Sequence, residues 1–76
     1  MQPAMKKLED TTTLLRRALS GESLTLDREA FSLHDLTQIA VALREGANLA
    51  IRNGDLMTPI ERASIATAGR GRIVFL

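Results

Sequence analysis

The feature of this 76-residue chain that most constrains its fold is a pattern that recurs about every 25 residues. The pattern consists of an apolar pair with one residue between its members and, after the first two pairs, a helix cap. In chain order these elements are Leu24-x-Leu26, Ser32-x-x-Asp35, Leu49-x-Ile51, Thr58-x-x-Glu61 and Ile73-x-Phe75. The helix core Ile39-Ala40 also recurs, as Ile65-Ala66. Because strand, cap and helix core recur in step, the sequence predicts a repeated strand–helix unit.

The repeated unit predicts a small α/β fold. The expected elements are strands at residues 23–27, 48–52 and 72–76, a helix from Ser32 to Gly46, and a helix from Thr58 to Gly69 with Pro59 in its first turn. Strands that are separated by single helices pair in parallel through right-handed crossovers. The order α-β-α-β-α-β therefore predicts a three-stranded parallel sheet, with the second and third helices on one face.

An N-terminal helix is expected at residues 3–20, with Pro3 in its first turn and Gly21 after its end. Its apolar positions, at helical spacing, are Met5, Leu8, Leu15 and Leu19. This stripe packs either on the chain's own sheet or on a second copy, and the sequence leaves the two possibilities open. We expect one domain over residues 1–76, with this helix in residues 1–21 and a βαβαβ unit in residues 22–76.

The core is expected to be aliphatic, because Phe31 and Phe75 are the only aromatic residues. The repeat helices carry apolar positions at Leu36, Ile39, Ala40 and Leu43, and at Ile60, Ala63, Ala66 and Thr67. The residues on the inner faces of their elements, which we expect to be among the most buried, are Leu26, Ile39, Leu49, Ile51 and Ile73.

Composition and charge argue against several classes of protein. The chain has no cysteine, so it forms neither disulfides nor thiolate metal sites. The net charge is +1 and the charges are mixed, which is not the electrostatic pattern of a nucleic-acid-binding domain. No apolar run approaches the roughly 18 residues of a membrane span, and the N-terminus lacks the apolar core of a secretory signal. We therefore expect a soluble cytoplasmic protein without cofactor or metal.

Two segments resemble known families. The patterns Leu24-x-Leu26-x-x-Glu29-x-Phe31 and Leu49-x-Ile51-x-x-Gly54-x-Leu56 are similar to the strand segment of leucine-rich repeats. Residues 23–69 resemble the central strand–helix–strand of STAS (anti-sigma-factor-antagonist) domains, through Leu24-Thr25-Leu26-Asp27, Phe31 and Gly46-Ala47-Asn48-Leu49-Ala50-Ile51. Both resemblances imply a βα scaffold that binds protein and has no chemistry of its own.

Two groups of polar residues could carry chemistry. Ser32, His34 and Asp35 are the residue types of a hydrolase triad, but positions this close on one helix point in different directions and cannot converge. Asp27, Glu29, Asp35 and Asp55 lie near the C-terminal ends of strands or at the following helix starts, where ligands bind in open α/β sheets. They could hold a cation, but acidic residues also stabilise helix starts at this position, and we prefer that interpretation.

The segment Gly69-Arg70-Gly71-Arg72 also has two interpretations. Its glycines and arginines could form an anion-binding nest made by Arg70, Gly71 and Arg72. Alternatively, Gly69 ends a helix, Gly71 forms a tight turn and the arginines bond the last helix carbonyls. We prefer the second interpretation, because no phosphate-loop pattern surrounds the segment.

The function that the sequence favours is non-enzymatic protein–protein interaction, with the chain self-associating as a homodimer. A domain this small buries little of its own surface, and its last strand would be an apolar sheet edge. The expected interaction surface is Met5, Leu8, Leu15, Leu19, Ile73, Val74 and Phe75. The alternative is nucleic-acid binding through Arg70, Arg72 and the basic N-terminal helix. An enzyme has the least support, because no converging nucleophile, base and pocket can be named.

Overall fold

The structure of the protein is a computed structural model that describes residues 10–76. The elements in chain order are α1 (Thr11–Leu19), β1 (Leu24–Asp27), α2 (Leu33–Ala42), β2 (Leu49–Arg52), the 3₁₀ helix η2 (Gly54–Leu56), α3 (Pro59–Ala68) and β3 (Ile73–Phe75). The predicted α-β-α-β-α-β order is confirmed.

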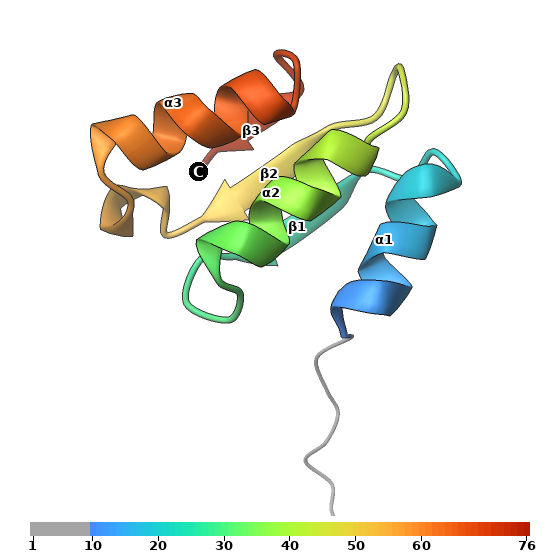
Figure 1. The fold of residues 1–76 in the computed structure, drawn as a ribbon, viewed down its shortest axis with the longest axis horizontal. Coiled ribbons are helices and arrows are strands. Elements are labelled where there is room, and N and C mark those ends of the chain that lie inside the picture. Colours follow the sequence, from blue (N-terminus) through green and yellow to red (C-terminus); the bar gives the residue numbers. More distant parts are fainter. Residues whose placement is uncertain (1–9) are drawn as a thin grey trace, which may run out of the picture.

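The three strands form one parallel sheet in the order β1-β2-β3 (Figure 1). Leu24 is the partner of Leu49, and Leu49 is the partner of Ile73. The second members of the apolar pairs align in the same way, with Leu26 beside Ile51 and Ile51 beside Phe75. The sequence repeat is therefore also the register of the sheet, which confirms the predicted parallel pairing.

The α-helices of residues 10–76 cover one face of this sheet (Figure 1). α1 packs against α2, and α2 packs against α3, so the helices follow one another in the same order as the strands. On the opposite face, the side chains of Thr25 and Val74 are exposed and that of Ala50 is half-buried. The described residues thus form two layers, with the core between the helices and one side of the sheet.

The two repeat helices begin where their caps predict. Ser32 Oγ accepts a hydrogen bond from Asp35 N–H at 3.1 Å at the start of α2. At the start of α3, Thr58 Oγ1 accepts from Glu61 N–H at 3.1 Å, and Glu61 Oε1 accepts from Thr58 N–H at 2.9 Å. This reciprocal pair is the predicted capping box. The predicted end of α2 at Gly46 is wrong, because the helix ends at Ala42 and Gly46 lies in the following turn with φ 89°.

The start of α1 differs from the prediction. Asp10 has extended backbone angles, and its Oδ1 accepts a hydrogen bond from Thr13 N–H at 2.9 Å. Asp10 is therefore the N-cap and the helix begins at Thr11, so a continuous helix over residues 3–20 is wrong. A capping carboxylate at Asp10 satisfies a free N–H of the first turn, which is where the β-branched threonines lie. Met5 and Leu8 lie outside the described residues.

The core cluster joins residues from the three α-helices, β1 and β2, and it contains none from β3. Its buried hydrophobic members are Leu14, Ala18, Leu24, Leu26, Leu36, Ile39, Ala40, Leu43, Ala47, Leu49, Ile51, Met57 and Ile65. Four of the five residues predicted to be most buried are confirmed, namely Leu26, Ile39, Leu49 and Ile51. The fifth, Ile73, is only half-buried, because β3 has a neighbouring strand on one side alone.

α3 buries less of its surface than α2 does. Of the apolar positions that the sequence suggests for this helix, Ile60 is 82% exposed and Ala63 is exposed, whereas Ile65 is the buried residue. Arg62 occupies part of the inner face, where its Nη1 donates to the carbonyls of Gly54 at 3.1 Å and Met57 at 3.0 Å. These bonds tie α3 to the turn that precedes it.

Candidate interaction surface

The apolar stripe predicted on α1 is displaced in the structure. Leu14 and Ala18 are the buried residues of this helix, at 2% and 0% exposure. Leu15 is half-buried against the core, and Leu19 is 53% exposed. Within the described residues, α1 therefore packs against α2 of the same chain through Leu14 and Ala18. Of the two proposed helix residues that the structure describes, Leu15 and Leu19, the side chain of Leu19 is the more accessible.

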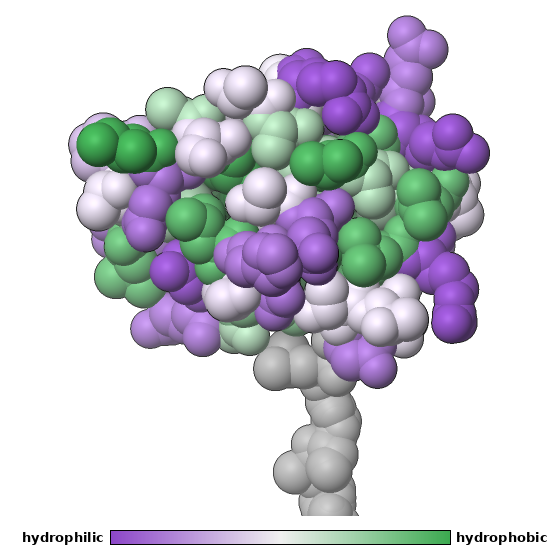
Figure 2. Space-filling model, viewed as in Figure 1, coloured by the Kyte–Doolittle hydropathy of each residue, from purple (hydrophilic) through white to green (hydrophobic). Residues whose placement is uncertain are grey.

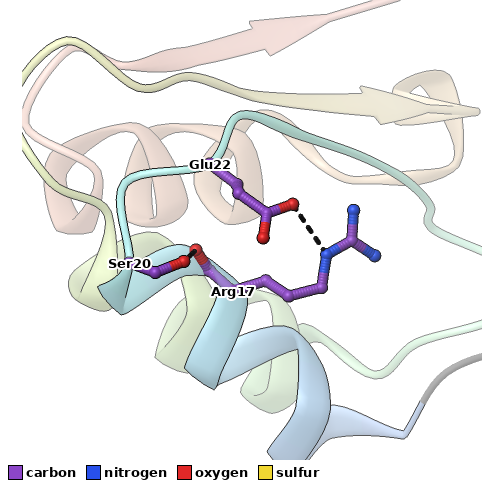
Figure 3. A network of polar contacts seen from close by, with 3 residues as sticks. All are labelled: Arg17, Ser20 and Glu22. Carbon is purple, nitrogen blue, oxygen red and sulfur yellow. Dashed lines mark hydrogen bonds and ion pairs between the residues drawn. The ribbon is translucent and has the colours of Figure 1, made fainter.

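The turn after α1 is held by polar contacts. Arg17 Nε lies 2.9 Å from Glu22 Oε1 in an ion pair, and Ser20 Oγ donates to the Arg17 carbonyl at 2.8 Å (Figure 3). From the next unit, Arg44 Nε donates to the carbonyl of Leu19 at 2.8 Å. The bonds from Ser20 and Arg44 satisfy carbonyls at the end of α1, and the Arg44 bond joins α1 to the segment after α2.

Arg70 repeats the role of Arg44 one unit later. Its Nη2 donates to the carbonyl of Leu43 at 2.8 Å, and its Nη1 lies 3.4 Å from the carbonyls of Val41 and Ala68. The guanidinium of Arg70 is thus used at the C-terminal ends of α2 and α3, as the second interpretation of this segment expects.

The rest of the Gly69–Arg72 segment forms a turn. Arg70 and Gly71 have positive φ angles, 53° and 84°. Arg72 is half-buried, and its Nη1 is buried without a hydrogen-bond partner among the described residues. The anion-binding role of Arg70, Gly71 and Arg72 stays a prediction.

The carboxyl ends of β1 and β2 are joined by side chains. Asp27 Oδ1 accepts hydrogen bonds from Asn53 Nδ2 at 2.9 Å and from Glu29 N–H at 2.8 Å. These two bonds, with a smaller contribution from the nearby charge of Arg52, lower the pKa of the Asp27 carboxyl. Asn53 has a left-handed conformation, with φ 59°.

Across residues 10–76, no group of three His, Asp or Glu side chains is placed to hold a metal ion.

The residues of the suggested triad do not converge. Ser32 caps α2 through the bond from Asp35 N–H, and His34 is exposed in the first turn of the helix. The Ser32 cap, to which Asp35 contributes its backbone N–H, and the exposed His34 agree with the capping interpretation.

β3 is the edge of the sheet, and its side chains divide between the two faces. Ile73 and Phe75 pack against the core but stay half-buried. Val74 and Leu76 are 46% and 64% exposed. A Cβ at Gly69 would lie 2.5 Å from Ile73 Cδ1, and one at Gly54 would lie 3.0 Å from Phe75 Cδ1, so both side chains pack on glycines.

Apolar side chains elsewhere on the surface are dispersed. Figure 2 looks onto the helix layer and shows separate apolar patches between polar side chains. The large exposed hydrophobic residues of the described chain are Leu19, Val41, Leu56, Ile60, Val74 and Leu76. Of these, Val74 and Leu76 lie two positions apart at the sheet edge that the sequence predicted, and Leu76 is not among the residues that the sequence suggested for the interaction surface.

Comparisons of the chain with protein-family models, with curated proteins and with solved structures find no match. The longest helices of residues 10–76 have ten residues, and none of the described helices could cross a membrane.

Proposed function

We propose that this chain is a cytoplasmic, non-enzymatic protein-interaction module that self-associates through β3. The observation that carries the proposal is the state of this strand. β3 has one neighbour in the sheet, and two apolar side chains that match buried positions of β2 stay half-buried. An apolar edge strand with unpaired backbone groups readily accepts a further strand. A second copy of the chain supplies that strand and covers Ile73, Val74 and Phe75.

The test is the solution mass measured by light scattering over a range of concentrations. We expect the mass to rise from that of one chain towards that of two, because association follows mass action. Val74→Lys should remain monomeric, whereas Thr25→Lys, on the same face of the opposite edge strand, should associate like the unaltered chain. An unaltered chain that stays monomeric at high micromolar concentration would contradict the proposal.

Nucleic-acid binding through Arg70, Arg72 and the N-terminal helix is the alternative that the sequence leaves. The geometry favours it less, because the donors of Arg70 already bond helix carbonyls. Salt-dependent binding of nucleic acid that Arg70→Ala with Arg72→Ala abolished would replace the first proposal with this one.

A further inference from the structure

The backbone groups of β3 alternate between the two sides of the strand. On the side of β2, Leu49 N–H donates to the carbonyl of Arg72 at 2.9 Å, and Leu76 N–H donates to the carbonyl of Ile51 at 2.9 Å. Because the pairing is parallel and alternates along the strand, residues 72, 74 and 76 bond β2. The N–H and C=O groups of Ile73 and Phe75 therefore point away from the sheet.

A second β3 that runs antiparallel to the first can form hydrogen bonds with these outward groups. In an antiparallel pair, opposed residues exchange both of their hydrogen bonds. A two-fold axis at Val74 places Ile73 of each copy opposite Phe75 of the other. All the outward groups of Ile73 and Phe75 in both copies are then paired. Val74 lies opposite its counterpart as a pair that exchanges no hydrogen bonds, the type in which side chains approach most closely.

The side chains agree with this register. Ile73 of one copy lies beside Phe75 of the other on the helix side of the sheet, where both are half-buried in the single chain. On the opposite face, the exposed Val74 side chains meet each other. Arg72 is opposed by Leu76 of the other copy, so no like charges face each other across the seam.

The other edge of the sheet is less suited to pairing. In β1, Leu24 N–H bonds the Asn48 carbonyl and Arg28 N–H bonds the Arg52 carbonyl, so the outward backbone groups belong to Thr25 and Asp27. A charged side chain on an edge strand opposes pairing with a further strand. β3 contains no charged residue.

We infer that two copies of this chain join by antiparallel β3–β3 pairing about a two-fold axis at Val74. This inference rests on the proposed self-association and specifies its geometry. The product is a six-stranded sheet in the order β1-β2-β3-β3-β2-β1, with the helices of both copies on the same side. Such an interface is closed and limits assembly to a dimer.

The test is cross-linking of Val74→Cys under mild oxidation, which is clean because the chain has no cysteine. The opposed Cα atoms of such a pair lie about 4.5 Å apart, within the range that a disulfide spans. We expect a covalent dimer to form roughly tenfold or more faster than with Ala50→Cys, because the dimer holds the two thiols together. Ala50 is the matched control, since it is the partner of Val74 on β2.

Three further outcomes separate the geometry from the proposed function. If the unaltered chain associates but Val74→Cys cross-links no faster than Ala50→Cys, the geometry is wrong and self-association stands. A mixture of Thr25→Cys and Val74→Cys that forms mainly mixed dimers would indicate head-to-tail pairing of β3 with β1, and also overturns the geometry. If the unaltered chain stays monomeric at high micromolar concentration, both proposals fail.

Discussion

β2 and β3 carry the same apolar pair but differ in burial. Leu49 and Ile51 in β2 are 0% exposed, whereas Ile73 and Phe75, their partners in the register, are half-buried. β2 lies between two strands, while β3 has one. In a repeat fold each unit contacts only its neighbours, so the number of neighbours decides how much of an equivalent residue is covered. We therefore expect the same sequence pattern to contribute unequal stability at different places in the sheet.

Truncating one isoleucine of the apolar pair in β2 and one in β3 should give the largest effects on the free energy of unfolding. We expect Ile51→Ala to lower the free energy of unfolding by roughly 2–5 kcal/mol, because it opens a cavity in a fully buried site. Ile73→Ala should cost less, about 1–2 kcal/mol, because its site is partly open to solvent and can relax. Chemical denaturation at low protein concentration, where dimerisation contributes least, measures both values. Equal losses would show that the two units are buried alike in solution.

Disturbing the packing of β3 against Gly69, at the C-terminal end of α3, should lower the free energy of unfolding by an intermediate amount. Gly69→Ala places a Cβ against Ile73, so one of the two must shift, and we expect a loss of about 1–3 kcal/mol. In the double variant Gly69→Ala with Ile73→Ala, the second change removes the clash. The loss should then be smaller than the sum of the two single losses. Additive losses in the denaturation measurement would mean that Gly69 and Ile73 are not in contact.

The pH dependence should be the smallest effect and should belong to the first two strands. The hydrogen bonds from Asn53 and Glu29 lower the pKa of Asp27 below its usual 3.8. A lowered pKa in the folded state means that this contribution is present above about pH 4 and is lost as the pH falls through the folded pKa. The free energy of unfolding should therefore fall less between roughly pH 5 and pH 3 in Asp27→Asn than in the unaltered chain.

Asn53→Gly is the matched control for this pH effect, because glycine keeps the left-handed backbone while it removes the amide that bonds Asp27. Denaturation at several pH values, with an NMR titration of the Asp27 carboxyl, measures the effect. An Asp27 pKa at or above its usual value in the folded chain would contradict the assignment.

The sequence predicts those parts of the fold that depend on local residues. The cap at Ser32 and the capping box at Thr58 begin the repeat helices where the pattern places them, because a cap is an interaction within one turn. The register of the sheet also follows from the apolar pairs, since a shift by one residue would move every apolar side chain to the other face.

Other features depend on contacts that the pattern does not contain. The N-cap at Asp10 competes with an apolar spacing that suggests an earlier start, and the hydrogen bond to Thr13 decides the boundary. The incomplete burial of Ile73 follows from the absence of a strand beyond β3 among the described residues. In the candidate surface, sequence identified β3, but the displacement of the α1 stripe to Leu14 and Ala18 depends on how α1 rests on α2.

The agreement between chain order and spatial order in both layers also has a consequence for folding. Each described strand pairs with the next one along the chain, so every closure in residues 10–76 spans one helix and its turns. Short closures lose little chain entropy and favour rapid folding. They also allow the structure to open one unit at a time from its ends. In the monomer, amide hydrogens of α3 and β3 would then exchange with solvent before those of β2, which has a neighbouring strand on both sides.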